Sequence, residues 1–136
     1  GYSIGEGVTE HQKQFVTDFL SAAGIAVQVT EELQDAVTAT SGSGPAYFFA
    51  IVEAMVKGAV DLGLSEEVAS ELVVQTLIGA AELLASSGKS AKTLRENVTS
   101  PNGTTYAALQ SFAASDLEAM VAKAMKAARD RSIELS

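Results

Sequence analysis

The sequence contains no cysteine, which excludes disulfide bonds, a thiolate nucleophile and a cysteine-ligated metal site. A chain without cysteine is compatible with the cytoplasm, where we expect this protein. The amino end lacks a basic region followed by an apolar one, so no signal peptide is predicted. The single histidine, His11, has no second histidine or close acidic ligand set beside it, and we expect it to be a solvated surface residue rather than a metal ligand.

Basic residues are also scarce, and the net charge is −8 at pH 7. That sign argues against a nucleic-acid backbone and against an anionic membrane surface as partners. The uncharged run over residues 36–52 contains Ser-Gly-Ser-Gly-Pro in its middle, so it is not a continuous apolar span. We therefore expect neither a nucleic-acid partner nor a membrane partner.

Aromatic residues make up only 6% of a sequence that is 47% hydrophobic, with alanine dominating over phenylalanine and tyrosine. This composition favours closely packed helices over a β-sandwich. A chain of 136 residues is long enough for one domain with a real core.

The first thirty residues combine three kinds of segment. Residues 1–8 are expected to be extended, Thr9 is placed to cap a helix over residues 10–23, and the β-branched run 25–29 predicts a strand. A single strand has no sheet to join, so this part resembles the end of an α/β domain whose other strands lie outside the sequence. We expect it to pack loosely or to exchange between subunits, because its strand edge is unpaired.

From residue 30 onward the hydrophobic periodicity is wholly helical. Residues 41–44 are predicted to break a first helix from a second one, in which Pro45 is the first residue. The predicted helices cover residues 31–37, 45–62, a segment capped by Ser65, 91–96, a segment from Thr104 or Thr105 to about residue 113, and 117–135.

Two of these helices are apolar on nearly all sides. In the helix over 45–62 the charged residues Glu53, Lys57 and Asp61 form one stripe, and the helix after Ser65 is as apolar. One chain of this size can scarcely surround two such helices. We therefore predict an all-α fold whose helices interlock with a second copy in a homodimer, preceded by the short α/β remnant. The alternative is a monomeric bundle with these helices at its centre.

Residues 99–105, Thr-Ser-Pro-Asn-Gly-Thr-Thr, combine hydroxyl groups, a tight turn and a helix start. Pro101 fixes φ at the second turn position, while Asn102 and Gly103 tolerate a positive φ. The first amides of the helix that follows have no intrahelical partner and carry the positive end of its dipole, which predicts an anion site.

No lysine or arginine lies between Glu96 and Met120, so this anion site suits a carboxylate better than a polyphosphate. The alternative is an ordinary Pro-Asn-Gly turn followed by a threonine N-cap.

Three motifs resemble the pyrroline-5-carboxylate reductase family, the last enzyme of proline biosynthesis. They are Asp-Ala-Val-Thr-Ala-Thr-Ser-Gly-Ser-Gly-Pro-Ala-Tyr at 35–47, Gln-Thr with Gly-Ala-Ala at 75–81, and Leu-Arg-Glu-Asn-Val-Thr-Ser-Pro-Asn-Gly-Thr-Thr at 94–105. The resemblance covers residues 5–135 and implies the C-terminal part of such an enzyme. It implies that residues 1–30 end a Rossmann domain and that 31–136 form the dimerisation and substrate-binding domain, in a homodimer or a higher oligomer.

The resemblance further implies that the full-length protein reduces 1-pyrroline-5-carboxylate to L-proline. NADPH or NADH would bind the Rossmann domain, so this chain alone is predicted to bind no cofactor and to be inactive. Thr105 would lie near the imine nitrogen, which receives a proton from Thr105 or from water. Asn102 departs from the usual glycine and adds bulk beside the carboxylate. The substrate-binding residues implied are Ser100, Pro101, Asn102, Gly103, Thr104 and Thr105.

Two other functions stay open on the sequence alone. In the first, the chain is a non-catalytic helical dimerisation module. In the second, it is the helical domain of another Rossmann dehydrogenase that acts on a small carboxylate. The substrate separates the enzymes, since a pyrroline reductase reduces a cyclic imine and does not act on hydroxy acids.

Overall fold

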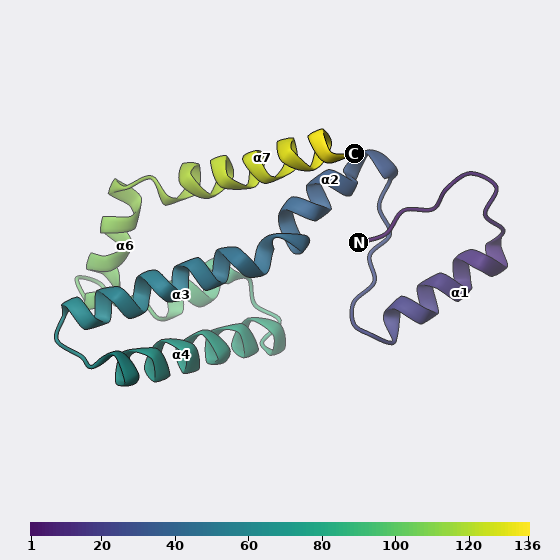
Figure 1. Cartoon of the computed structure of the whole chain (residues 1–136). Helices are drawn as coiled ribbons and strands as arrows, with labels where there is room; N and C mark the ends of the chain where they lie inside the picture. Colours follow the sequence, from purple (N-terminus) through teal and green to yellow (C-terminus); the bar gives the residue numbers. More distant parts are fainter. The chain divides into compact units, whose positions relative to one another are not determined.

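The computed structural model describes all residues, 1–136, and confirms the predicted all-helical fold (Figure 1). By packing, the chain divides into two compact units, one of Gly1–Gly44 with Ala122–Ser136 and one of Pro45–Val121. In chain order the elements are α1 (Glu10–Ser21), the 3₁₀ turn η1 (Glu31–Leu33), α2 (Gln34–Val37), the π turn η2 (Thr38–Gly42), α3 (Gly44–Asp61), α4 (Glu66–Ser86), α5 (Ala91–Asn97), α6 (Thr104–Ala114) and α7 (Leu117–Leu135).

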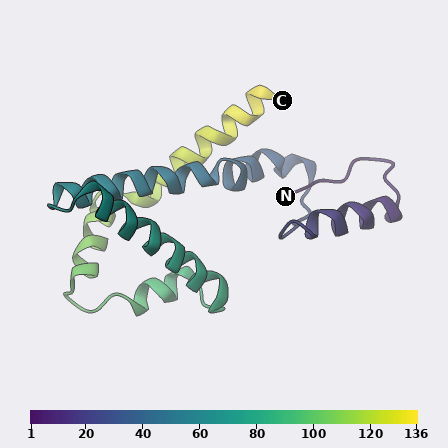
Figure 2. The same cartoon turned by 60° about the horizontal axis from the view of Figure 1, so that its bottom comes forward.

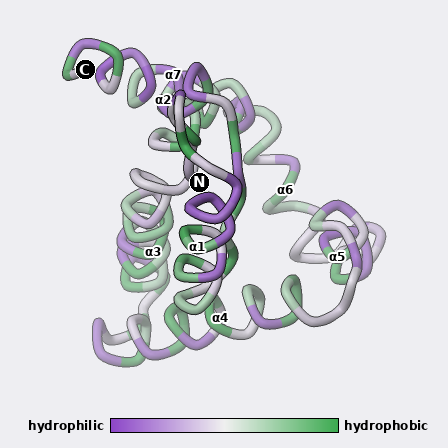
Figure 3. The backbone as a smooth tube through the Cα atoms, turned by 90° about the vertical axis from the view of Figure 1, so that its right-hand side faces the viewer, coloured by the Kyte–Doolittle hydropathy of each residue, from purple (hydrophilic) through white to green (hydrophobic).

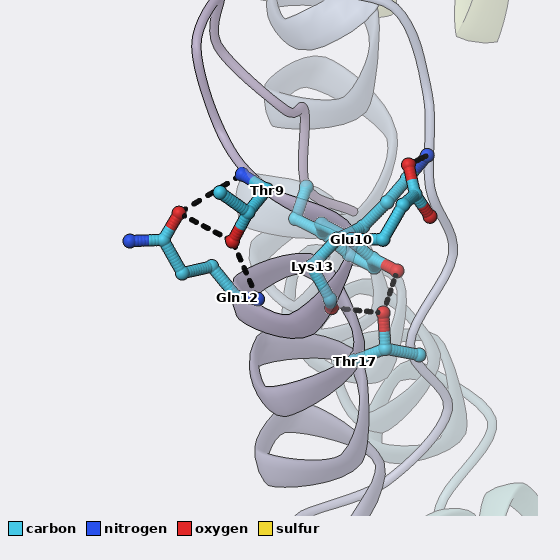
Figure 4. A network of polar contacts seen from close by, with 6 residues as sticks. Thr9, Glu10, Gln12, Lys13 and Thr17 are labelled. Atoms are coloured by element: carbon cyan, nitrogen blue, oxygen red, sulfur yellow. Dashed lines mark hydrogen bonds and ion pairs between the residues drawn. The ribbon is translucent and has the colours of Figure 1, made fainter.

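Helix α1 begins at the predicted N-cap. The Thr9 hydroxyl accepts a hydrogen bond from the Gln12 backbone N–H at 3.3 Å, and the Gln12 side-chain oxygen accepts one from the Thr9 N–H at 2.9 Å (Figure 4). This reciprocal pair is a capping box, and it satisfies two amides that the helix leaves free. The helix ends at Ser21, slightly before the predicted residue 23.

The strand predicted at residues 25–29 does not form, so helix α1 is the one regular element of the expected α/β remnant. Only one isolated parallel bridge joins Tyr2 and Gln28. In it the Tyr2 N–H donates to the Val27 carbonyl at 3.0 Å, and the Val29 N–H donates to the Tyr2 carbonyl at 2.9 Å. Two short segments without further strands beside them are marginal as a sheet, which explains the difference.

The predicted break at residues 41–44 is confined to Ser43, because the π turn η2 keeps Ser41 and Gly42 helical and α3 begins at Gly44. There the Ser43 N–H donates to the Thr38 carbonyl at 2.8 Å, and the hydroxyls of Thr40 and Ser41 donate to the carbonyls four residues before them. Hydroxyl groups that bond back to the helix in this way compete for its carbonyls without ending it. Helix α3 then starts at Gly44, one residue before Pro45.

In the second unit, α3 and α4 form an antiparallel pair joined by a short turn, and they diverge away from that turn (Figures 1 and 2). Hydrophobic positions recur along both helices (Figure 3). Few of them are covered: Ala69 and Val73 are buried, whereas Phe48, Phe49 and Leu72 are 60%, 64% and 54% exposed. The single chain therefore leaves large apolar faces of α3 and α4 uncovered, as the all-round apolar pattern predicts.

Helix α4 is capped by the Ser65 hydroxyl, as predicted. By length and composition alone it could also cross a membrane, a test that the core helices of soluble proteins pass as well.

Candidate functional site

The site begins where α5 ends. Ser90 caps α5 by accepting a hydrogen bond from the Thr93 N–H at 3.1 Å, and α5 ends at Asn97. The Thr99 hydroxyl then donates to the Arg95 carbonyl at 2.6 Å, which ties the start of the following loop to the last turn of α5. Sequence reasoning missed this bond, although a threonine four residues after a helical residue is a recognisable signal for it.

A tight turn over residues 100–103 follows. The Gly103 N–H donates to the Ser100 carbonyl at 3.1 Å and closes the turn. Asn102 has a φ of +59°, so the predicted positive φ is confirmed at that residue. Pro101 before an asparagine with positive φ is the pattern of a type II turn.

Gly103 itself has a φ of −81°, so Asn102 alone adopts the positive φ that both residues tolerate. Position 103 is nevertheless crowded. A Cβ at position 103 would overlap the Ser100 hydroxyl oxygen and lie 3.2 Å from the Ser100 carbonyl oxygen. A side chain at position 103 would therefore require the Ser100 hydroxyl to rotate away and the Ser100 carbonyl to shift slightly, a crowding that no sequence pattern reveals.

Helix α6 starts at Thr104 with Gly103 as its N-cap, and no side chain caps it. The alternative of a threonine N-cap is therefore wrong. By contrast, the hydroxyls of Thr9, Ser65 and Ser90 cap α1, α4 and α5. The first amides of α6 point out of the helix end without an intrachain partner, and they lie at the positive end of its dipole.

Hydroxyl groups surround this helix end. Those of Ser100, Thr104 and Thr105 make no hydrogen bond within the chain. Ser100, Pro101, Asn102 and Thr104 are exposed, whereas Gly103 and Thr105 are half-buried. The structure thus brings all six predicted site residues to one turn and one helix start, with Thr105 the more enclosed of the two helical threonines.

No charged side chain dominates the site. Two carboxyl groups with a lowered pKa lie elsewhere. A hydrogen bond from the Thr30 hydroxyl lowers the pKa of Glu32 most, and the Glu32 backbone amide contributes next. A hydrogen bond from Lys126 lowers the pKa of Asp130 most, and one from Arg129 contributes next. No cluster of three or more acidic or histidine residues is arranged to hold a metal ion, and His11 is exposed as predicted. Amides, hydroxyls and a helix dipole can bind and orient a carboxylate, but they supply no strong acid or base.

Comparisons with known proteins identify the family of the chain. The family model described as pyrroline-5-carboxylate reductase dimerisation matches residues 31–135. The chain belongs to this family. It is 51% identical over 130 residues to the pyrroline-5-carboxylate reductase of Pseudomonas aeruginosa, which covers 95% of this chain and 48% of that protein. It is 41% identical to the enzyme of the same name from Arabidopsis thaliana, over 98% of this chain and 49% of that protein.

Solved structures agree with this membership of the pyrroline-5-carboxylate reductase dimerisation family. The structure of a pyrroline-5-carboxylate reductase from Coxiella burnetii matches with a TM-score of 0.93 and 38% identity, over 98% of this chain and 50% of that one. The pyrroline carboxylate reductase of Plasmodium falciparum, solved with NADP bound, matches with a TM-score of 0.84 and 33% identity, over 94% of this chain and 52% of that one. The chain spans about half the length of the curated relatives it matches.

Proposed function

We propose that this chain is the C-terminal half of a pyrroline-5-carboxylate reductase, and that the full-length protein reduces 1-pyrroline-5-carboxylate to L-proline in the cytoplasm. The observation that carries the proposal is the uncapped start of α6 behind the Ser100–Gly103 turn, in a chain of this family. Its amides and hydroxyls match a small anionic substrate, and the absence of a nearby cation disfavours a polyphosphate.

In the proposed complex the substrate carboxylate accepts hydrogen bonds from the first amides of α6 and from the hydroxyls of Ser100 and Thr104. Pro101 and Asn102 shape the turn that holds them. The Thr105 hydroxyl faces the ring nitrogen and donates a proton to it, directly or by orienting a water molecule. NADPH or NADH, when bound by the other half of the protein, supplies the hydride that the C=N carbon accepts. The chain's own contribution is to fix the distance and orientation of the imine.

A second copy of the chain is the proposed partner of residues 31–136. The exposed apolar side chains of α3 and α4 support this, because soluble monomers rarely leave such faces in water. Interlocking with a partner would bury them. The proposal also allows this dimer to assemble into a higher oligomer.

Residues 1–30 are proposed to end the nucleotide-binding domain. The parallel bridge between Tyr2 and Gln28, connected through α1, supports this, since parallel pairs joined by a helix are the unit of that class of domain. The chain by itself is therefore expected to bind no nicotinamide cofactor and to have no activity.

The experiment is to incubate the full-length protein with 1-pyrroline-5-carboxylate and either NADPH or NADH, and to follow the loss of the reduced cofactor. Formation of proline with one of the two cofactors is the expected result, and 2-hydroxy acids with the oxidised cofactor serve as the comparison. Oxidation of a hydroxy acid without reduction of the imine would replace the proposal with that of another small-carboxylate dehydrogenase. No turnover of either substrate would favour the alternative that the chain is a non-catalytic dimerisation module.

A further inference from the structure

Thr99 is the last residue before the turn of residues 100–103, and it makes two hydrogen bonds to the end of α5. Its N–H donates to the Glu96 carbonyl at 3.1 Å, three residues back, and not to the Arg95 carbonyl, four residues back, as in a regular α-helix. Its hydroxyl donates to the Arg95 carbonyl instead, at 2.6 Å. The Thr99 side chain therefore supplies the bond that the backbone gives up where α5 ends.

The first half of the turn has no other attachment to α5. Neither the backbone N–H groups of Ser100 and Asn102 nor their side chains make a hydrogen bond within the chain, and Pro101 has no N–H to offer. The bond from the Gly103 N–H to the Ser100 carbonyl closes the turn on itself without joining it to α5. The two bonds of Thr99 are therefore the last hydrogen bonds between α5 and the turn.

The segment after Thr99 is stiff. The proline ring fixes φ at Pro101 and restricts Ser100 to extended conformations. A change in the direction in which the chain leaves Thr99 is therefore passed on to the Ser100 hydroxyl. That hydroxyl lies so close to Gly103 that a Cβ at position 103 would overlap it. Because Gly103 is the N-cap of α6, such a change would shift the Ser100 hydroxyl relative to the first amides of α6.

We propose that Thr99 is a positioning residue for the substrate carboxylate, and that its bond to the Arg95 carbonyl fixes where the Ser100 hydroxyl lies before the start of α6. The proposal rests on the proposed function, in which the carboxylate binds this hydroxyl and the first amides of α6. Thr99 acts through Ser100 and not on the substrate, because its own hydroxyl proton is donated to Arg95. Thr105 lies on α6, beyond the turn, so proton transfer to the imine should depend little on Thr99.

Steady-state kinetics of the full-length protein test this role through a split between KM and kcat. Thr99→Val keeps the shape of the side chain and removes the hydroxyl. The KM for 1-pyrroline-5-carboxylate is expected to rise about 3- to 10-fold, the size of one lost hydrogen bond, with kcat within about twofold of the parent. Thr99→Ser keeps the hydroxyl and should restore the KM to within about twofold. An unchanged KM in the valine variant, or a serine variant as impaired as the valine one, would overturn the proposal.

The matched control is Ser86→Ala, which removes a bond of the same kind from the end of another helix. Ser86 is the last residue of α4, and its hydroxyl donates to the Glu82 carbonyl, four residues back, at 2.7 Å. The KM of this variant should stay within about twofold of the parent. An equal rise in KM in Ser86→Ala and Thr99→Val would show that any loosened helix end has this effect, and would contradict a specific role for Thr99.

Hydrogen exchange at the Gly103 amide tests the attachment of the turn without any measurement of activity. In Thr99→Val this amide should exchange at least about 5-fold faster than in the parent, because the turn that it closes is no longer held to α5. The Ser87 amide, which donates to the Leu83 carbonyl at 3.0 Å, reports that the fold is intact. Equal exchange at Gly103 in the two proteins would overturn the role of Thr99 even if the imine is reduced. Faster exchange in the variant, with no imine reduction by the parent, would overturn the proposed function alone.

Discussion

Gly103 and Ser100 lie so close together that a Cβ at position 103 would overlap the Ser100 hydroxyl. Replacing Gly103 by alanine should therefore destabilise the turn, although its φ of −81° is open to any residue. We expect Gly103→Ala to lower the free energy of unfolding by about 1–3 kcal/mol, which is typical of overpacking. It should also raise the KM for 1-pyrroline-5-carboxylate, because the amides at the start of α6 shift. Urea unfolding and steady-state kinetics of the full-length protein measure the two effects.

The matched control removes the Ser100 hydroxyl. In a Ser100→Ala background the nearest side-chain atom to the new Cβ is the Ser100 Cβ, at 3.6 Å, which is an ordinary contact. The stability lost through Gly103→Ala should then be smaller than in the parent, leaving only the contact with the backbone carbonyl. Equal losses in both backgrounds would show that the hydroxyl is not the source of the crowding.

Asn102 should tolerate glycine but not a β-branched residue, because its φ is +59°. We expect Asn102→Val to cost about 1–2 kcal/mol of stability from the left-handed conformation alone. Asn102→Gly should leave stability nearly unchanged and lower the KM of the full-length protein, since it removes a side chain beside the proposed carboxylate site. Thermal unfolding of the two variants, side by side, reports the first expectation. A valine variant as stable as the glycine one would mean that the turn adopts another conformation.

The hydroxyl of Thr105 is the proposed proton donor or water-positioning group. Thr105→Val keeps the shape of the side chain and removes the hydroxyl, so kcat should fall on the order of 100-fold, the lower range for a general acid. Thr105→Ser should restore most of the rate. Both variants should unfold like the parent, because the hydroxyl makes no intrachain hydrogen bond. A valine variant with unchanged kcat and a raised KM would limit Thr105 to substrate binding.

Much of the fold is predictable because it depends on local chemistry. Thr9 and Ser65 mark helix starts, since their hydroxyls satisfy amides a few residues away. The positive φ of Asn102 follows from the same kind of reasoning, since asparagine adopts that conformation more readily than most residues. In each case the residue and its partner lie within one turn of each other in the sequence.

The differences arise where the deciding partner is distant or missing. The strand expected at residues 25–29 needs neighbouring strands that the chain does not contain, so only the bridge to Tyr2 remains. The helix break expected at residues 41–44 is confined to Ser43, because the π turn η2 extends the helix to Gly42. The crowding at position 103 depends on an approach to Ser100 that the turn creates only once it has formed.

The ion pairs around Asp130 give a pH dependence of stability. Lys126 and Arg129 lower the pKa of Asp130 in the folded chain, so the carboxylate stabilises the fold above its unfolded pKa of about 4. That contribution should disappear as the pH falls through the lower, folded pKa. Asp130→Asn should therefore melt slightly below the parent at pH 7, and the two should converge in acid or in molar salt. A difference that persists in acid would point to another role for Asp130.

The mass of the purified chain across a dilution series tests most directly that the exposed apolar faces of α3 and α4 belong to an interface between copies. Light scattering should give a dimer of about twice 14.0 kDa, or a multiple of it, that persists on dilution. The substrate site would then be held by a subunit that folds together with its partner. A folded monomer at every concentration would contradict the interlocked arrangement, because Phe48, Phe49 and Leu72 would remain in water.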